Sequence, residues 1–168
     1  MTILSRYSAS LEKLARPLSP FARKTRDMSI DIKYQAVATA IGGRDGRAFS
    51  EDSTLDLKLS TPRELGGAGG EGTNPEQLFA TGYAACFLSA LHLVGRREKV
   101  NLPAETSVRA TVGIGPNGSG GYGLAVTLFA DVPGVNRSVA EHLVTSAHQV
   151  CPYSNAIRNN VPVELKIA

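Results

Sequence analysis

The sequence predicts an α+β fold with a mostly antiparallel sheet. Strand-like runs, rich in β-branched residues or alternating apolar and polar, come in blocks rather than one at a time. Two helical patterns separate the blocks, which gives the order three strands, helix, two strands, helix, strand. Blocks of strands divided by helices are typical of α+β proteins, whereas parallel α/β sheets alternate strand and helix. The expected strands are 31–41, 47–50, 55–59, 106–114, 122–130 and 161–167.

The first helix begins with strong local signals. Asn74 is a good N-cap, Pro75 suits the first helical position, and Gln77 stands where a capping-box partner would. The helix is apolar and rich in alanine and other small residues over 72–94, so we expect other elements to cover it on several sides. Residues 136–150 form a second amphipathic pattern, which the proline of Cys151-Pro152 ends.

Length and composition indicate one soluble globular domain. The chain has 168 residues, of which 42% are hydrophobic and 20% charged. No run approaches the ~20 apolar residues of a membrane-spanning helix, so we expect no membrane role. The net charge is +3, but residues 28–168 hold 12 basic and 13 acidic side chains. That domain lacks the basic excess that nucleic-acid binding requires.

Residues 1–27 form an N-terminal extension outside the predicted fold. They hold six basic and two acidic side chains and several serines, a composition found in mitochondrial transit peptides. Two interpretations stay open: a targeting segment, or a disordered tail before a domain that starts at Met28. The second implies a cytoplasmic protein, and the first a mitochondrial one.

The chain has two cysteines, Cys86 inside the apolar helix and Cys151 at the end of the second helix. Two are too few for a disulfide scaffold or a structural zinc site. A cysteine in an alanine-rich helix can be a small core residue, and a static disulfide is a further alternative. Cys151 directly precedes the polar segment 152–155, which begins with proline and which we expect to be mobile. It is therefore well placed to approach a second thiol.

A reactive Cys86 needs a cation, because a free thiol with a pKa of about 8.5 is mostly protonated at neutral pH. The helix N-terminus lies some three turns away and is too distant. Arg44, in the glycine-rich turn 42–46 between the first two strands, is the best candidate, fixed by Glu76 or Asp45. Ten residues of straight helix separate Glu76 from Cys86 by about 15 Å, so Arg44 would have to lie between them, with a bend at Gly82.

Four segments resemble the organic hydroperoxide resistance (Ohr) family, in the superfamily of osmotically inducible protein C. The match runs through essentially all of residues 29–168, and its segments are GGRDGR (42–47), LSTPRELGG (59–67), NPEQLFATGYAACF (74–87) and VCPYSNA (150–156). The resemblance implies a thiol peroxidase for organic, including lipid, hydroperoxides. Cys86 would be the peroxidatic cysteine and Cys151 the resolving one. Arg44 would stabilise the thiolate and the peroxide, with Glu76 holding Arg44 in place.

The resemblance also implies the assembly and the partners. It implies an intertwined homodimer with two active sites at the subunit interface, no bound cofactor, and a dihydrolipoyl group on a lipoylated protein as the external reductant. An apolar wall for the alkyl tail of the substrate would include Leu78, Phe79 and Phe87. The segment Ile157-Arg158-Asn159-Asn160 differs from the family pattern and touches none of these roles.

Three other functions were weighed against this one. A cysteine hydrolase needs a histidine base beside Cys86, but His92 lies about 240° around the helix from it, and His142 and His148 belong to a solvated or half-buried helix face. A non-catalytic redox sensor would form the disulfide once, without turnover. A metal site has no recognisable ligand spacing in this chain.

Overall fold

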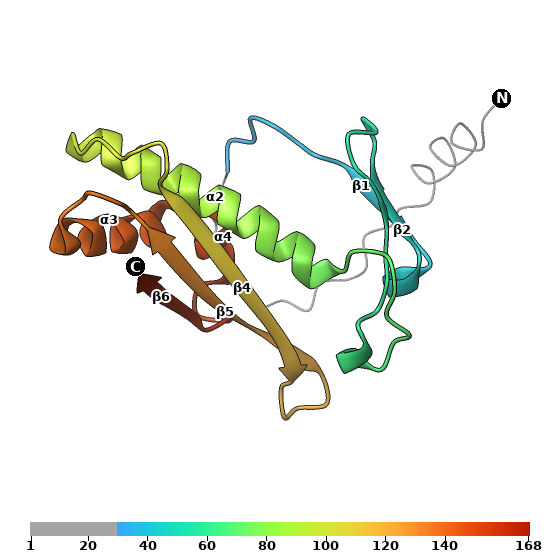
Figure 1. Cartoon of the computed structure of the whole chain (residues 1–168). Helices are drawn as coiled ribbons and strands as arrows, with labels where there is room; N and C mark the ends of the chain where they lie inside the picture. Colours follow the sequence, from blue (N-terminus) through green and yellow to red (C-terminus); the bar gives the residue numbers. More distant parts are fainter. Residues whose placement is uncertain (1–29) are drawn as a thin grey trace. The chain divides into compact units, whose positions relative to one another are not determined.

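The computed structural model describes residues 30–168. Residues 36–168 form one compact unit to which residues 30–35 do not belong, so the fold given below is that of residues 36–168. The predicted N-terminal extension and its boundary at residue 28 lie outside the described residues. The α+β prediction is confirmed, with two three-stranded sheets, one long helix between them in the chain and two further helices beside the second sheet (Figure 1).

The first sheet is small and wholly antiparallel. It holds β1 (Ala38–Ile41), β2 (Arg47–Ser50) and β3 (Asp56–Lys58), in that spatial order. The prediction of a strand over 31–41 is wrong for residues 31–37, which are not in a strand. The reason is the partner strand: β1 pairs with β2 from Ala38 opposite Ser50, and the chain turns away after Ser50. Residues 31–37 therefore have no neighbouring strand to complete a ladder.

A tight turn joins β1 to β2 and carries Arg44. It contains one 3₁₀ turn, η1 (Gly43–Asp45), preceded by Gly42 with a φ of 76° in the left-handed region. A Cβ on Gly46 would overlap the carbonyl group of Ile41. Both glycines are thus required by the backbone path, as the sequence predicted for this turn.

The glycine-rich segment between β3 and the first long helix is anchored at both ends. It contains η2 (Arg63–Leu65), and Leu59 forms an isolated parallel bridge with Thr73. The Thr73 N–H donates to the Lys58 carbonyl at 2.9 Å, and the Ser60 N–H donates to the Thr73 carbonyl at 2.9 Å. These bonds fix where the following helix begins relative to the small sheet.

That helix, α2 (Pro75–Glu98), starts as predicted. The Asn74 side chain accepts a hydrogen bond from the Gln77 N–H at 2.9 Å. The Gln77 side chain does not complete a capping box, because it accepts the hydroxyl proton of Thr73 instead. The helix continues without interruption through Gly82 to Glu98, so this glycine does not break it.

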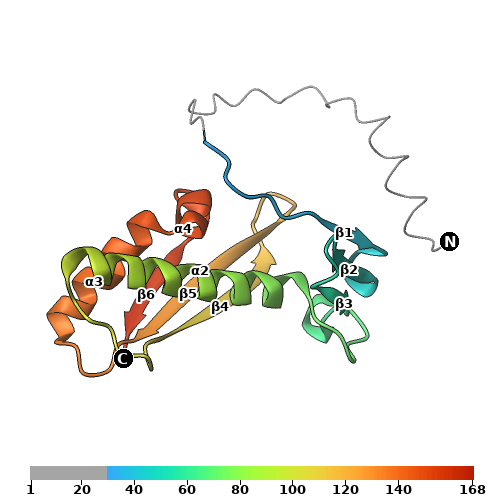
Figure 2. The ribbon, with the colours of Figure 1, turned by 90° about the horizontal axis from the view of Figure 1, so that it is seen from above.

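The second sheet is larger and lies against α2. Its strands are β4 (Ser107–Pro116), β5 (Tyr122–Asp131) and β6 (Val163–Ile167), in the order β4-β5-β6. The β4–β5 pair is an antiparallel hairpin, and β6 runs parallel to β5. The parallel pair follows from the connection, because two helices cross over between β5 and β6. Figure 2 shows α2 running along this sheet with α3 beside it.

The second helical pattern is α3 (Arg137–Val150), capped by the Asn136 side chain, which accepts from the Ser138 N–H. The segment after it, for which the sequence predicts a polar and mobile stretch, is helical. Residues Pro152–Ile157 form a short helix, α4, in which Ser154 is fully buried. Proline at the first helical position lets the chain restart as a helix at once, with Cys151 at the junction.

The core lies between α2, α3 and the second sheet. It is formed by one face of α2, alternate residues of β5 and one face of α3, chiefly Tyr83, Phe87, Leu91, Val94, Val126, Leu128, Leu143, Val144 and Ala147. Within this chain α2 is covered on that face only, since Leu78, Thr81, Ala85 and Ser89 are exposed at helical spacing. The sequence had predicted cover on several sides.

In length and composition alone, α2 is long and apolar enough to cross a membrane, contrary to the expectation from sequence. A third of its most apolar window is buried inside this domain. A core helix of a globular protein passes the same test of length and composition, so the helix is weak evidence for a membrane span.

Candidate active site

The two cysteines lie together, although 65 residues separate them in the sequence. The Sγ atoms of Cys86 and Cys151 are 3.5 Å apart, and both are free thiols. A disulfide bond is about 2.05 Å long, so an approach of roughly 1.5 Å would join them. Sequence spacing left this pairing open, and the packing of α2 against the α3–α4 junction produces it.

The two sulfur atoms differ in their access to solvent. Cys151 is fully buried, with 0% of its surface exposed, whereas Cys86 is partly exposed. Cys86 stands at the edge of the buried face of α2, between Tyr83 and Phe87. A molecule arriving from solvent therefore meets the Cys86 sulfur before that of Cys151.

Among residues 30–168, no cation lies beside the Cys86 thiol. Burial raises its pKa above the ordinary value for cysteine, and the neighbouring Cys151 raises it further. The backbone N–H of Tyr153, at the start of α4, lowers the pKa of Cys86 and opposes this rise. In a single copy of the chain, the environment of Cys86 favours the protonated thiol.

Arg44 and Glu76 form a second pair, with two parallel hydrogen bonds. Arg44 Nη1 donates to Glu76 Oε2 at 2.8 Å, and Nη2 donates to Oε1 at 2.7 Å. The Glu76 side chain is 13% exposed and that of Arg44 is 38% exposed. Asp45, the other acid that the sequence offers as a partner for Arg44, accepts instead from the Thr61 N–H at 2.8 Å.

Each member of this ion pair favours the charged form of the other. Hydrogen bonding to Arg44 lowers the pKa of Glu76, against a smaller opposing effect of burial. Glu76 in turn raises the pKa of Arg44. The pair is therefore fully ionised at neutral pH, and it holds the guanidinium group at the N-terminal end of α2.

The two pairs do not meet within one chain. Glu76 and Cys86 lie on the same continuous helix, ten residues and hence about 15 Å apart. No hydrogen bond or ion pair among residues 30–168 joins Arg44 to either cysteine. A combined site of all four residues stays a prediction that a second copy of the chain would have to complete.

Aromatic residues that the sequence did not single out surround the thiols. The Tyr83 hydroxyl group hydrogen-bonds to that of Ser154 at 2.8 Å, in the buried interior. The Tyr153 ring stacks on Phe79 at 5.9 Å between centroids. A Cβ on Gly82 would lie 3.1 Å from Tyr153 Oη, so Tyr153 packs over this glycine. The VCPYSNA segment gave the only sequence signal for Tyr153 and Ser154.

The three predicted wall residues have different environments. Leu78 is 38% exposed, Phe79 is partly buried, and Phe87 has no exposed surface. Phe87 packs against Tyr83 and His148 inside the core. Leu78 and Phe79 can thus present apolar surface to a ligand, whereas Phe87 has none exposed and contributes to the core.

The three histidines lie on α2 and α3, and none of them forms a hydrogen bond with Cys86. His142 is exposed and pairs with Glu98 at 3.1 Å. His148 is half-buried, and burial followed by the charge of Arg158 lowers its pKa. Within residues 30–168, no three His, Cys, Asp or Glu side chains gather as metal ligands would.

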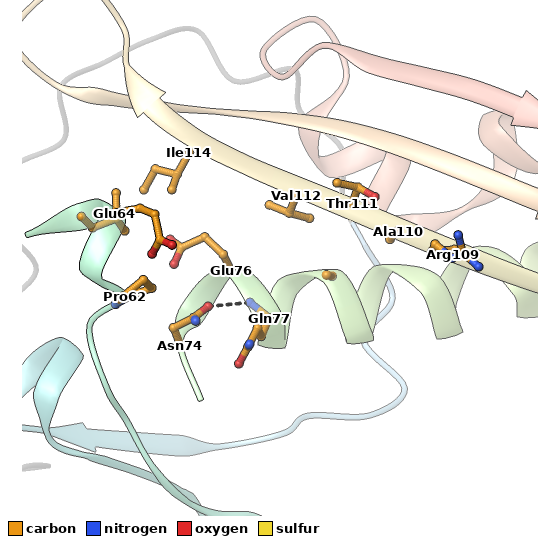
Figure 3. Close-up of a pocket in the computed structure, with 12 residues that line it drawn as sticks. Pro62, Glu64, Asn74, Glu76, Gln77, Arg109, Ala110, Thr111, Val112 and Ile114 are labelled. Carbon is orange, nitrogen blue, oxygen red and sulfur yellow. Dashed lines mark hydrogen bonds between the residues drawn. The ribbon is translucent and has the colours of Figure 1, made fainter. Parts of the chain in front are cut away.

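A cavity of about 500 Å³ opens beside the N-terminal end of α2 (Figure 3). Glu64 and Glu76 extend into it from η2 and α2, and β4 forms the opposite wall. Neither cysteine lines it. The cavity thus belongs to the Arg44–Glu76 end of the molecule, and the thiol pair lies outside it.

The fold and the two thiols together define the class of protein: an α+β protein with two small sheets, whose central helix places one cysteine against another. The family model of the OsmC-like proteins matches residues 67–166. An organic hydroperoxide resistance protein of Xanthomonas axonopodis pv. citri (strain 306) is 58% identical over 137 residues, or 82% of this chain and 96% of that protein.

Solved structures give the same result. Organic hydroperoxide resistance proteins from Legionella pneumophila and Elizabethkingia anophelis match with TM-scores of 0.77 and 0.78, at 48% and 47% identity. The matches cover 82% and 83% of this chain and 98% and 99% of those chains. The chain belongs to the OsmC-like family, and within it to the organic hydroperoxide resistance proteins.

Proposed function

We propose that this protein is a cysteine-based peroxidase that reduces organic hydroperoxides to alcohols and so protects against oxidative stress. The observation that supports this most is the 3.5 Å separation between a partly exposed thiol, Cys86, and a buried one, Cys151. Membership of the organic hydroperoxide resistance proteins supplies the substrate class.

The chemistry proceeds in three balanced steps. The Cys86 thiolate attacks the distal oxygen of ROOH; the S–O bond forms, the O–O bond breaks, and the alkoxide takes a proton to leave as ROH. The Cys151 thiol then attacks the sulfenic sulfur, so the S–S bond forms and the hydroxyl group leaves as water. An external dithiol reduces the disulfide by thiol–disulfide exchange and is itself oxidised to a disulfide.

Apolar surface beside Cys86 favours an alkyl hydroperoxide over hydrogen peroxide. Phe79 and the Tyr153 ring form a stack on α2 and α4, and Leu78 adds exposed apolar surface one position before Phe79. Burying an alkyl tail contributes about 0.8 kcal/mol for each CH₂ group. Hydrogen peroxide has no such group and gains nothing from this surface.

The active form in this proposal is a homodimer in which Arg44 and Glu76 of one copy serve Cys86 of the other. Three observations support it. The Arg44–Glu76 pair lies too far from Cys86 of its own chain, the thiol has no cation beside it among residues 30–168, and apolar side chains are exposed on β1 and nearby. Val37, Ile41 and Leu55 are 52%, 58% and 52% exposed. A second copy would cover these and the exposed face of α2.

A direct test of the reaction uses single-cysteine variants. Reduced protein is mixed with cumene hydroperoxide, tert-butyl hydroperoxide or hydrogen peroxide, with dihydrolipoamide or a thioredoxin system as reductant. Cys86→Ser should abolish peroxide consumption, whereas Cys151→Ser should complete one turnover and leave a sulfenic acid. Full activity of Cys86→Ser would refute the proposal. A disulfide that forms once and is not turned over by either reductant would point to a redox sensor.

The reductant in this proposal is a dihydrolipoyl group carried by a lipoylated protein, with no cofactor bound to the chain itself. A dithiol on a flexible arm can reach a thiol set between aromatic side chains. Turnover requires that the disulfide be reduced again, which suits a reducing compartment, so we place the protein in the cytoplasm. Faster turnover with a thioredoxin system than with dihydrolipoamide would contradict the choice of reductant.

Subunit mixing tests whether Arg44 acts across the dimer. Arg44→Ala and Cys86→Ser should each be inactive alone. After unfolding and refolding together, each mixed dimer would hold one complete site, made of Cys86 from one copy and Arg44 from the other. An equal mixture should recover about a quarter of the wild-type activity per subunit, because half of the dimers are mixed and half of their sites are complete. No recovery would exclude action across the interface.

A further inference from the structure

The junction between α3 and α4 contains a backbone carbonyl group that the helix cannot satisfy. In a continuing α-helix, the His148 carbonyl would accept from the N–H of residue 152, four positions on. Residue 152 is proline and has no N–H to give. The preceding bond of the series is intact, with the Cys151 N–H donating to the Ala147 carbonyl at 2.9 Å. The break therefore falls at the turn that carries Cys151.

Arg158 provides the missing donor. Its Nη2 donates to the His148 carbonyl at 2.7 Å and to Asn155 Oδ1 at 2.9 Å, and its Nη1 donates to the Gln149 side chain. His148 and Gln149 belong to the last turn of α3, and Asn155 belongs to α4. The guanidinium group of Arg158, at the end of α4, thus joins the chain before Cys151 to the chain after it. We call this set of hydrogen bonds the clamp.

This arginine is not part of an ion pair. Among residues 30–168 no carboxylate lies within 4 Å of it, and its Nε is buried without a hydrogen-bond partner. Its charge acts instead on the interior: after burial, it is the second cause that lowers the pKa of His148, and it opposes the rise that burial gives the pKa of Tyr83. Tyr83 hydrogen-bonds to Ser154 of α4, so the clamp and the thiol pair share one buried region.

We propose that Arg158 is a positioning residue of the redox site, which fixes α4 against the end of α3 and so holds Cys151 in reach of Cys86. The proposal rests on the proposed function, because it concerns the condensation of Cys151 with an oxidised Cys86. Two groups at the start of α4 depend on the clamp. One is Cys151 Sγ, 3.5 Å from Cys86 Sγ, and the other is the Tyr153 N–H, which lowers the pKa of Cys86.

The segment Ile157-Arg158-Asn159-Asn160, to which the sequence analysis gave no role, acquires one through this geometry. Loss of the clamp would leave the first peroxide step possible, because Cys86 lies on α2. The second step would slow, because a displacement of about 1 Å between reacting groups can cost up to about 100-fold in rate. The expected defect is therefore in resolution of the sulfenic acid, and not in its formation.

The test measures how the oxidised Cys86 partitions between two products. Reduced full-length protein receives one equivalent of cumene hydroperoxide in the presence of dimedone, and mass spectrometry quantifies the dimedone adduct against the Cys86–Cys151 disulfide. Wild-type protein should give mainly disulfide. Arg158→Met, which keeps an unbranched apolar stem and removes every donor, should raise the adduct-to-disulfide ratio by about tenfold or more. Asn155→Ala removes one acceptor only and should raise it less.

Two controls separate positioning from a loss of stability. Val144→Ala truncates a core side chain of α3 that is 1% exposed and makes none of the hydrogen bonds of the clamp, and it should lower stability with a wild-type product ratio. Arg158→Lys keeps the charge without the fork and should fall between wild type and Arg158→Met. A ratio for Arg158→Met equal to that of Val144→Ala would overturn the proposal. If the wild-type protein forms neither product, the proposed function itself fails.

Discussion

Replacing Glu76 by glutamine keeps the shape of the side chain but removes its charge and one of its two acceptor oxygens. The amide oxygen can still accept one Arg44 hydrogen bond, and the amide nitrogen then faces the other guanidinium N–H. Hydrogen bonds to charged groups contribute about 1.5–3 kcal/mol, and fully exposed ion pairs about 0–1 kcal/mol. Glu76 is 13% exposed and Arg44 38%, so we place the loss between these limits, at about 2 kcal/mol.

A free energy of about 2 kcal/mol corresponds to a change of roughly 30-fold in the fraction of molecules with Arg44 held in place. If that arginine activates Cys86 in the dimer, Glu76→Gln should lower kcat/KM for cumene hydroperoxide by up to the same factor. The rate of Cys86 alkylation at pH 6 should fall as well, because the thiolate loses its cation. Stability to urea should fall by about 2 kcal/mol.

The small sheet offers a matched control. Arg47 and Asp56 form a second two-bond pair, with both distances 2.6 Å, but their side chains are 56% and 54% exposed. Asp56→Asn should therefore cost only about 0.5 kcal/mol and leave kcat/KM within about twofold. Equal losses of stability and activity in Glu76→Gln and Asp56→Asn would refute the reasoning, since burial would then have no influence on the pair.

The same pair predicts a pH dependence with a definite sign. Arg44 lowers the pKa of folded Glu76 below its value in the unfolded chain, about 4.3. The pair therefore stabilises the fold fully at neutral pH, and this contribution is lost as the pH falls through the folded pKa. Between pH 5 and 3, roughly the range of this titration, urea midpoints of the wild-type protein should fall more steeply than those of Glu76→Gln. Parallel curves would show that the pair adds no pH-dependent stability.

Three further changes test other parts of the structure. Gly46→Ala would drive a Cβ into the Ile41 carbonyl, so thermal unfolding should show a loss on the order of 3 kcal/mol or a displaced turn with low activity. Tyr83→Phe leaves the buried Ser154 hydroxyl unpaired and should lower the free energy of unfolding by about 1–2 kcal/mol. A double-mutant cycle of Tyr83 and Ser154 should give a coupling energy, and additive effects of the two changes would contradict this. Phe79→Ala should raise KM for cumene hydroperoxide much more than for hydrogen peroxide, and equal shifts would argue against an apolar wall.

Much of the fold follows from local patterns in the sequence. The cap at Asn74, the turn at Gly42–Gly46 and the end of α3 before Pro152 depend on backbone chemistry that single residues reveal. The extent of β1 does not, because a strand continues only where a neighbour pairs with it. A β-branched run alone cannot indicate how long that neighbour is.

The site is predictable in part for the same reason. The cysteines, Arg44 and Glu76 were identified by residue type and motif, and the structure joins them two by two. The distance between the pairs follows from the length of α2, which runs unbroken from the Glu76 end past Cys86. The roles of Tyr153 and Arg158 depend on contacts across α4, a helix that its polar composition concealed.

The unequal burial of the two sulfur atoms determines how an oxidised site can be reset. With Cys151 enclosed and Cys86 partly open, an incoming dithiol would attack the Cys86 sulfur, and Cys151 would depart as the leaving thiol. The mixed disulfide would then form between the reductant and Cys86. The Cys86 sulfur would thus react with the peroxide in one half-reaction and with the reductant in the other. Both substrates would reach it by the same route, so turnover should follow ping-pong (substituted-enzyme) kinetics.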